Sequence, residues 1–409
     1  MPALDGMKVL DLTQYEAGTS CTQYLAWFGA TVYKVEHPDR GDPGRATEGA
    51  GKDSLYFMSF NHNKKSVAIN LGKPEGRELF LKMVPNVDAV VENFSLGTME
   101  KLGIGYDVLK QINPAIIYGT IKGFGTTGPY KNFRSFDWVA QAAGGAYSVT
   151  GDADGPPVRP GATVADTGSG MHLAMGILAA YIQRLKTGTG QMVEIAMQET
   201  VANFMRMPMS RRERNPGVPV PRTGNRMVVP TAVYPCAPGG SNDHVFIMVV
   251  TSRMWDALLA GLGMVDLLMD ERYATHAARL EHQDELWDTI AEWTRQRTKF
   301  EVMELLGAAG VPCSAVYDSE DILHDRHLHE RNMIRTIHHP VRGDWEMLGP
   351  PIHLSDSVVE MIPAPLLGQH TGEVLAAELG LSAAEIDALA GLRVLRIEPP
   401  IPAGSAAAG

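Results

Sequence analysis

The sequence predicts an α/β protein in which a large domain with a mostly parallel sheet is joined to a smaller α+β domain. Short β-like runs alternate with helical runs through the first half of the chain, and this alternation is typical of βαβ units. A charged, Pro-rich segment then precedes a second block of strands and helices. A chain of 409 residues is also long enough for two domains.

Apolar periodicity and Gly or Pro boundaries define the elements of the first block. Helices are expected at residues 19–29, 75–83 and 171–185, and the last ends before Gly188, a residue type that commonly terminates helices. Because helices alternate with strands, the strands are expected to run parallel. The strands are expected at residues 8–12, 31–35, 88–91, 115–121 and 193–197.

The segment RRERNPGVPVPRTG at residues 211–224 is predicted to be a linker, because Pro, Gly and charged residues disfavour regular structure. It divides the chain into a large domain at residues 1–210, continued at 326–402, and a small α+β domain at 225–325. Residues 403–409 are expected to form a disordered tail. In the small domain, strands are expected at residues 228–234, 245–250 and 312–317, and helices at 252–262, 281–295 and 299–309.

Composition excludes several function classes. A net charge of −11 argues against a nucleic-acid partner. The three cysteines, Cys21, Cys236 and Cys313, show neither a disulfide pattern nor a metal-ligand spacing. No apolar run reaches the roughly 18 residues of a membrane span, and the N-terminal residues lack signal-peptide features. We therefore expect a cytoplasmic protein without a metal or a membrane partner. A nicotinamide enzyme is disfavoured, because the turn TQYEAG after the first strand lacks the Gly-rich phosphate loop.

One acid, Asp166, stands in the apolar, Gly-rich stretch RPGATVADTGSGMHLAMG at residues 159–176. Asp is a good N-cap, so Asp166 fits the start of a helix that begins a few residues later. Asp166 is also suited to act as a nucleophile that attacks an activated acyl group. In that interpretation, the turn Gly168-Ser169-Gly170 leaves room for a ligand, and amides at the helix start bind a developing oxyanion.

Other candidates lie near the ends of the predicted strands. Glu16 follows the first strand, at the sheet edge where open α/β folds bind ligands, although it also fits a solvated loop acid. Asp137 and Gln141 are spaced to share one helix face, either in a site or in solvent. Basic and aromatic side chains at strand ends suggest a polyanionic ligand, although each alone fits a solvated surface residue. These are Lys64, Lys65, Asn93, Phe94, Lys101, Lys122, Lys131 and Arg134.

Taken together, several segments resemble the class III CoA-transferases, the family that includes formyl-CoA:oxalate and carnitine CoA-transferases. The segments run in order through nearly the whole chain. They include LDGMKVLDLTQYEAG, DSLYF, VVENFSLGTMEKLG, GDADGPPVRPGATVADTGSGMHLAMGILAA and APLLGQHTGEVL. The resemblance implies a Rossmann-like large domain, a smaller domain and two chains interlocked like links.

The resemblance also assigns roles to residues. Asp166 inherits the role of the nucleophile, which forms a mixed anhydride with the acyl donor and then an aspartyl-CoA thioester; Glu16 lies beside it. CoA thioesters are then substrates, and no cofactor is permanently bound. The expected CoA contacts are His37, Asn93, Phe94, Lys101, Leu102 and Arg134. The expected substrate contacts are Tyr15, Ala17, Phe136, Asp137, Gly239 and Gly240.

The partners are an acyl-CoA and a carboxylic acid. The opening LDLTQYEAGTSCT is more similar to transferases for larger acids, and Glu16 stands where formyl-CoA transferases carry Gln. The resemblance therefore implies succinyl-CoA as donor and an aryl- or alkyl-substituted dicarboxylate such as benzylsuccinate as acceptor. A formyl-CoA:oxalate type of transferase is the first alternative. An α-methylacyl-CoA racemase is a second, although residues 136–138 replace its signature His. A homodimer is expected, and a partner subunit of a hetero-oligomer is a further alternative.

Overall fold

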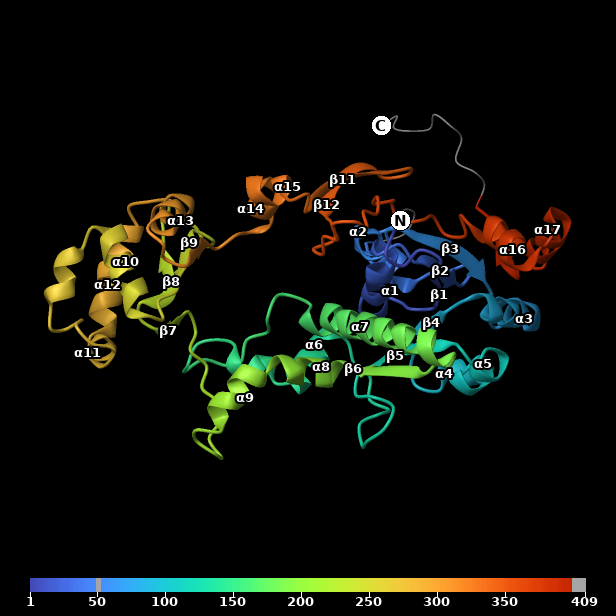
Figure 1. Ribbon diagram of the computed structural model, residues 1–409, viewed down its shortest axis with the longest axis horizontal. Helices are drawn as coiled ribbons and strands as arrows, with labels where there is room; N and C mark the ends of the chain where they lie inside the picture. Colours follow the sequence, from blue (N-terminus) through green and yellow to red (C-terminus); the bar gives the residue numbers. More distant parts are fainter. Residues whose placement is uncertain (49–52, 399–409) are drawn as a thin grey trace. The chain divides into compact units, whose positions relative to one another are not determined.

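A computed structural model describes residues 1–48 and 53–398 of the chain (Figure 1). The chain forms two compact units. The large unit comprises Met1–Ala146, Arg159–Gly217 and the residues from His329 onward, and the small unit comprises Tyr147–Val158 and Val218–Leu328. The predicted tail at residues 403–409 lies outside the described residues.

The large unit contains a seven-stranded sheet with the order β13-β3-β2-β1-β4-β5-β6. All neighbouring strands are parallel except β13, which pairs antiparallel with β3. The chain starts in the middle of the sheet and reverses direction between β1 and β4, which is the arrangement of a Rossmann-like fold. The predicted α/β class is therefore confirmed. The strands are β1 (Lys8–Asp11), β2 (Thr31–Glu36), β3 (Lys64–Ile69), β4 (Ala89–Glu92), β5 (Ile117–Lys122), β6 (Met192–Ala196) and β13 (Leu395–Arg396).

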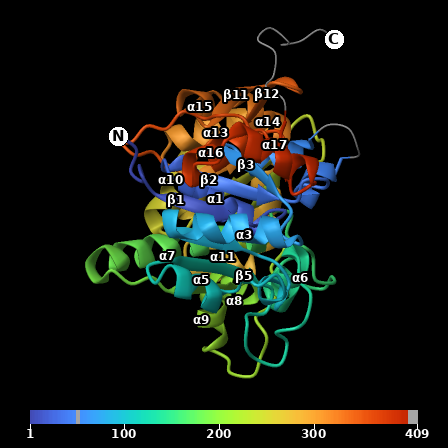
Figure 2. The same cartoon turned by 90° about the vertical axis from the view of Figure 1, so that its right-hand side faces the viewer.

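Helices cover both faces of this sheet, and alternate strand residues point into two hydrophobic cores. Val9 of β1 belongs to the core shared with α1 (Ala17–Trp27) and α7 (Val164–Thr187). Leu10, the next residue, belongs to the core shared with α3 (Pro74–Met83), α5 (Tyr106–Ile112) and α16 (Thr371–Leu379). Figure 2 views the large unit from the side of α3 and α5.

Shorter elements complete the large unit. The helices are α2 (Leu55–Ser59), α4 (Thr98–Lys101), α6 (Asp137–Ala143), α8 (Met197–Phe204), α9 (Arg206–Arg212), α15 (Arg326–Glu330), which begins before the unit boundary, and α17 (Ala383–Gly391). A hairpin of β11 (Ile334–His339) and β12 (Gly343–Leu348) precedes α16. The strands β3, β11, β12 and β13 were not predicted from the sequence.

The small unit is built on an antiparallel sheet with the order β10-β9-β8-β7. It also includes Tyr147–Val158, which the sequence placed in the large domain. Arg222 donates to the carbonyl oxygens of Asp152 (3.1 Å) and Gly155 (2.6 Å), so the end of the predicted linker packs on this segment. The elements are β7 (Arg226–Val228), β8 (Thr231–Pro235), β9 (His244–Ile247), β10 (Cys313–Ala315), α10 (Ser252–Leu262), α11 (His276–Glu281), α12 (Gln283–Thr294), α13 (Lys299–Ala308) and α14 (Ser319–His324).

The start of α7 differs from the prediction. The helix begins at Val164, seven residues before the expected start, and Thr163 is its N-cap, so the N-cap interpretation of Asp166 is wrong. Gly168 and Gly170 are helical and do not form a turn. A Cβ on Gly170 would lie 2.6 Å from the backbone oxygen of Ala17 in α1. A Cβ on Gly168 would lie 2.7 Å from the ring of Phe204. Both glycines therefore allow the close packing of α7 against α1 and α8.

Candidate active site

A cavity of about 640 Å³ opens at the carboxyl ends of the parallel strands in the large unit. Its walls come from the loops after β1, β4 and β5 and from the first turn of α7. Ligands bind at this edge in open α/β sheets, next to the point where the strand order reverses. The lining residues are Gln14, Tyr15, Glu16, Ala17, Asn93, Phe94, Ser95, Leu96, Thr98, Ile121, Lys122, Gly123, Lys131, Asn132, Phe133, Arg134, Ser135, Phe136, Asp166 and Met197.

Asp166 lines this cavity as the third residue of α7 and is half-buried. Burial raises the pKa of its carboxyl to about 8, and the nearby charges of Glu16 and Asp137 add to the effect. Within the described residues, the carboxyl forms no hydrogen bond. A carboxylate that is poorly solvated and unpaired is a reactive nucleophile when ionised.

Glu16 lies next to Asp166 and is tied to the same helix turn. Its oxygen Oε1 accepts hydrogen bonds from the hydroxyls of Thr163 (2.5 Å) and Thr167 (2.8 Å). The side chain is buried, and burial raises the pKa of Glu16 despite these two bonds; the charge of Asp137 raises it further. A raised pKa reduces the repulsion between Glu16 and Asp166, because it favours the neutral acid.

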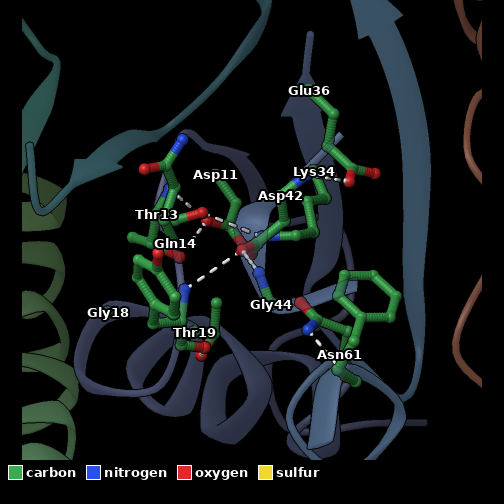
Figure 3. Close-up of polar contacts among 12 residues, drawn as sticks. Asp11, Thr13, Gln14, Gly18, Thr19, Lys34, Glu36, Asp42, Gly44 and Asn61 are labelled. Carbon is green, nitrogen blue, oxygen red and sulfur yellow. Dashed lines mark hydrogen bonds and ion pairs between the residues drawn. The ribbon is translucent and has the colours of Figure 1, made fainter. Parts of the chain in front are cut away.

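The loop that leads to Glu16 is held by buried charged groups, among them Lys34 and Asp42 (Figure 3). Tyr15 has a left-handed backbone, with a φ of 59°, and its N–H donates to Asp42 Oδ1 at 3.2 Å. Lys34 donates to the carbonyl of Thr13 at 2.9 Å and forms an ion pair with Asp42 at 2.9 Å. Both members of this pair are almost completely buried. The loop therefore keeps an unfavourable conformation through long-range contacts.

The loop after β4 is held in a similar way. Phe94 donates its N–H to Glu92 Oε2 at 2.8 Å and accepts from Lys122 Nζ at 2.6 Å. Lys122 and Glu92 form a largely buried ion pair at 2.8 Å. These contacts place Phe94 at the cavity wall.

Most predicted CoA and substrate contacts lie in the large unit, but they do not all reach the cavity. Arg134 and Phe136 are exposed and line it, and the ring of Phe136 packs edge-to-face on Tyr15 at 5.9 Å. The cavity wall does not include His37, Lys101 or Leu102. His37 follows β2, Lys101 ends α4, and Leu102 packs against the core.

Three predicted contacts have other surroundings. Asp137 is buried behind the cavity wall, where it bonds to the start of α7. Gly239 and Gly240 belong to the small unit, in the connection between β8 and β9.

The suggestion that Lys64 contacts a polyanion is wrong, because its ammonium is completely buried and pairs with Asp11 at 3.0 Å.

Tyr56 is a neighbour of Glu16 and Asp166 that reasoning from the sequence missed, although it is not part of the cavity wall. It lies in α2, is half-buried, and has the pKa of its phenol raised by burial and then by the charges of Glu16 and Asp166. The phenol therefore stays protonated and can donate a hydrogen bond beside the two acids. The only signal in the sequence is its place in the motif DSLYF.

Within residues 1–48 and 53–398, no cluster of three or more His, Cys, Asp or Glu side chains has the arrangement of a metal site. Within the same residues, no helix has both the length and the apolar character needed to span a bilayer.

Comparison with known proteins identifies the family of the chain and agrees with its fold. Residues 4–371 match the family described as CoA-transferase family III. The chain is 40% identical over 400 residues to a formyl-CoA:oxalate CoA-transferase of Streptomyces coelicolor, covering 94% of this chain and 97% of the relative. It is 38% identical over 405 residues to a formyl-CoA:oxalate CoA-transferase of Rhodopseudomonas palustris, covering 94% and 95%.

The fold is also similar to that of a solved structure. A CaiB/BaiF family protein from Brucella suis superposes with a TM-score of 0.81 at 31% identity, covering 92% of this chain and 99% of that one. The Streptomyces and Rhodopseudomonas relatives are named for the formyl-CoA:oxalate reaction, the first alternative that the sequence suggested, and not for the benzylsuccinate reaction. A match over most of the chain, with relatives of this identity, shows that the chain belongs to CoA-transferase family III.

Proposed function

We propose that the protein transfers CoA from an acyl-CoA to a carboxylic acid through an aspartyl-CoA thioester on Asp166. The observation that carries this proposal is the position of Asp166, an unpaired carboxyl on the wall of a cavity at the carboxyl edge of the sheet. The cavity also has the aromatic and cationic side chains that a CoA thioester requires, among them Phe94 and Arg134.

The reaction balances without an added proton. The Asp166 carboxylate attacks the thioester carbonyl, a C–O bond forms, the C–S bond breaks, and CoA leaves as a thiolate. The thiolate attacks Cγ of Asp166, which forms the aspartyl thioester and releases the donor acid as a carboxylate. The acceptor carboxylate then attacks the thioester and the thiolate attacks the new anhydride, which yields the product acyl-CoA and regenerates Asp166.

The substrate pair that the relatives support is formyl-CoA and oxalate, because proteins of that name are about 40% identical to this chain. A second pair, succinyl-CoA with an aryl- or alkyl-substituted dicarboxylate such as benzylsuccinate, is favoured by Glu16. The carboxyl group of Glu16 lies beside Asp166, and it would weaken the binding of a small dianionic acceptor there by repulsion between like charges. The exposed rings of Tyr15 and Phe136 at the cavity can also pack against an aryl group.

The test is to incubate the protein separately with formyl-CoA and succinyl-CoA and to quench with hydroxylamine or borohydride. Intact mass and a peptide map then locate the product. We expect modification at Asp166, its loss in Asp166→Asn, and its retention in the control Asp107→Asn, which changes an exposed acid of α5. An unmodified Asp166 with both donors, together with α-proton exchange in a 2-methylacyl-CoA, would instead support racemase chemistry.

We also propose that the active protein is a homodimer. Apolar side chains stay exposed on one stretch of the large unit, from α7 to α8, and large exposed apolar patches mark interfaces. They are Met171, Met175, Ile182, Leu185, Met192 and Phe204. Light scattering on the purified chain checks this: a monomer that gains activity only with a second, homologous chain would support the hetero-oligomer instead.

A further inference from the structure

The N-terminus of α7 is capped by a residue from another helix. Thr163, the N-cap residue, makes no capping bond with its side chain. Instead, Oδ1 of Asp137, the first residue of α6, accepts the backbone N–H groups of Ala165 (2.9 Å) and Asp166 (3.0 Å). The N–H of Val164 donates to the carbonyl of Ala162 at 2.9 Å. The N–H groups of the first three residues of α7 are therefore all used.

Asp137 is itself held in place by Gln141, one turn later in α6. The amide of Gln141 donates to Asp137 Oδ2 and to the carbonyl of Ala162 at 2.9 Å. Both side chains are buried, 5% and 0% exposed. The pair thus connects α6 to the residues just before and just inside α7, and it leaves the backbone of Asp166 little freedom to move.

This cap also changes the electrostatics of Asp166. Free amides and the helix dipole stabilise an acid in the first turn of a helix and lower its basicity. Here a second negative charge occupies two of those amides. Among the described residues, the charged and titratable groups that face Asp166 are Asp137 from α6, Glu16 from the loop after β1 and Tyr56 from α2. None of these three groups is a cation, so burial and like charge both raise the pKa of Asp166.

We propose that Asp137 is a positioning residue that fixes the backbone of Asp166 and prevents the helix N-terminus from stabilising the Asp166 anion. A carboxylate without that stabilisation is more basic and attacks a thioester faster. This inference rests on the proposed role of Asp166 as the nucleophile. It replaces the expectation that Asp137 contacts the substrate, because the side chain of Asp137 is absent from the cavity wall.

The test compares Asp137→Asn with the wild type. The amide keeps an oxygen for the two N–H groups but removes the charge, whereas Asp137→Ala removes both. The control is Asp107→Asn, the same change in an exposed acid of α5. Two readouts are followed from pH 5 to 10. The first is the single-turnover rate of aspartyl-CoA formation. The second is labelling of Asp166 by a carbodiimide and an amine, which reports its protonated fraction without any substrate.

We expect the midpoints of both profiles to move to lower pH by about one unit in Asp137→Asn, with a plateau rate several-fold lower. The melting temperature should fall less than in Asp137→Ala, because only the bond with the Gln141 amide is lost. Asp137→Ala should lower the rate at every pH and also the melting temperature. Asp137→Ser provides a second neutral acceptor in case the Asn variant does not fold.

The two proposals fail separately. Unchanged midpoints in the neutral variants, with a normal adduct on Asp166 in the wild type, would overturn the role of Asp137 and leave the proposed function intact. Absence of an adduct in the wild type would overturn the proposed function. The carbodiimide profile would still report whether Asp137 controls the ionisation of Asp166.

Discussion

The side-chain amide of Asn93 forms two hydrogen bonds with the backbone of Gln14. Its Oδ1 accepts the N–H of Gln14 at 2.8 Å, and its Nδ2 donates to the carbonyl of the same residue at 2.8 Å. Asn93 follows β4 and Gln14 follows β1, so this contact joins two loops of the cavity wall at the point where the strand order reverses. Asn93 thereby acts as a clamp between these loops.

Asn93→Asp should weaken this clamp, because a carboxylate oxygen would face the carbonyl of Gln14 in place of a donor. We expect a loss of about 1–3 kcal/mol in the free energy of unfolding and a higher KM for the acyl-CoA. The matched control is Asn86→Asp, which removes a similar bond to the carbonyl of Glu378 on the surface. Equal KM values for the two variants would contradict the role of the clamp. Urea unfolding and steady-state kinetics are the measurements.

The buried pair of Lys34 and Asp42 should be sensitive to which partner is changed. Lys34→Met leaves the Asp42 charge buried without its cation, so we expect a loss of about 3–5 kcal/mol in urea unfolding. Asp42→Asn should cost less, because its oxygen can still accept from Tyr15 and Gly44. Lys82→Met, in the exposed pair with Glu78, is the control and should change stability by no more than about 0.5 kcal/mol. If Lys34→Met changed the free energy of unfolding by a similarly small amount, the buried pair would not support the loop after β1.

Asp166→Asn should stabilise the protein more as the pH rises. In the folded protein the pKa of Asp166 is about 8, above its ordinary value of 3.8. Ionisation therefore opposes folding, with a cost that begins above the ordinary pKa and is complete only above pH 8. One pKa unit corresponds to about 1.4 kcal/mol, so at pH 8.5 we expect the free energy of unfolding of the variant to exceed that of the wild type by more than about 2 kcal/mol. This difference in stability should vanish near pH 4. Chemical unfolding across this pH range tests it, and a gap that does not depend on pH would refute it.

Glu16→Gln should change both the pH profile and the choice of acceptor. The amide oxygen can still accept from Thr163 and Thr167, but the charge that raises the pKa of Asp166 is removed. We expect the acid limb of kcat/KM to move to lower pH and small dicarboxylates such as oxalate to become better acceptors. Glu75→Gln, in an exposed turn of α3, is the control. If kcat/KM stays the same for every acceptor, Glu16 does not set the acceptor range.

Gly170→Ala should disturb the packing of α1 on α7, because the new Cβ would lie 2.6 Å from the backbone oxygen of Ala17. Forcing the two helices apart is expected to cost about 1–3 kcal/mol, and activity should fall because Glu16 and Asp166 lie at these helix starts. Gly372→Ala in α16 meets no atom within 4 Å and serves as the control. It should be neutral or stabilising by about 0.5–1 kcal/mol. Thermal unfolding and CoA-transfer assays would show whether the two variants differ.

The sequence by itself determined the alternation of strands and helices, because that pattern depends on the spacing of apolar residues along the chain. Strands β1, β2, β4, β5 and β6 and helices α1, α3 and α10 lie close to where periodicity placed them. The strand β13 has only two residues and pairs with β3 from more than 300 positions away, so no local pattern marks it. Asp166 was found through its motif, and the family through an ordered set of such motifs.

Only the tertiary structure decided how these residues work together. Glu16 meets Thr163 and Thr167 across about 150 positions, and Asn93 meets Gln14 across 79. Asp137 could be predicted to share a helix face with Gln141, but its bond to the backbone of Asp166 depends on how α6 packs against α7. Lys64 looked like a surface cation because its charge is evident in the sequence, whereas its burial against Asp11 is not. Burial and long-range pairing set the ionisation of this site, and both arise only when distant segments pack together.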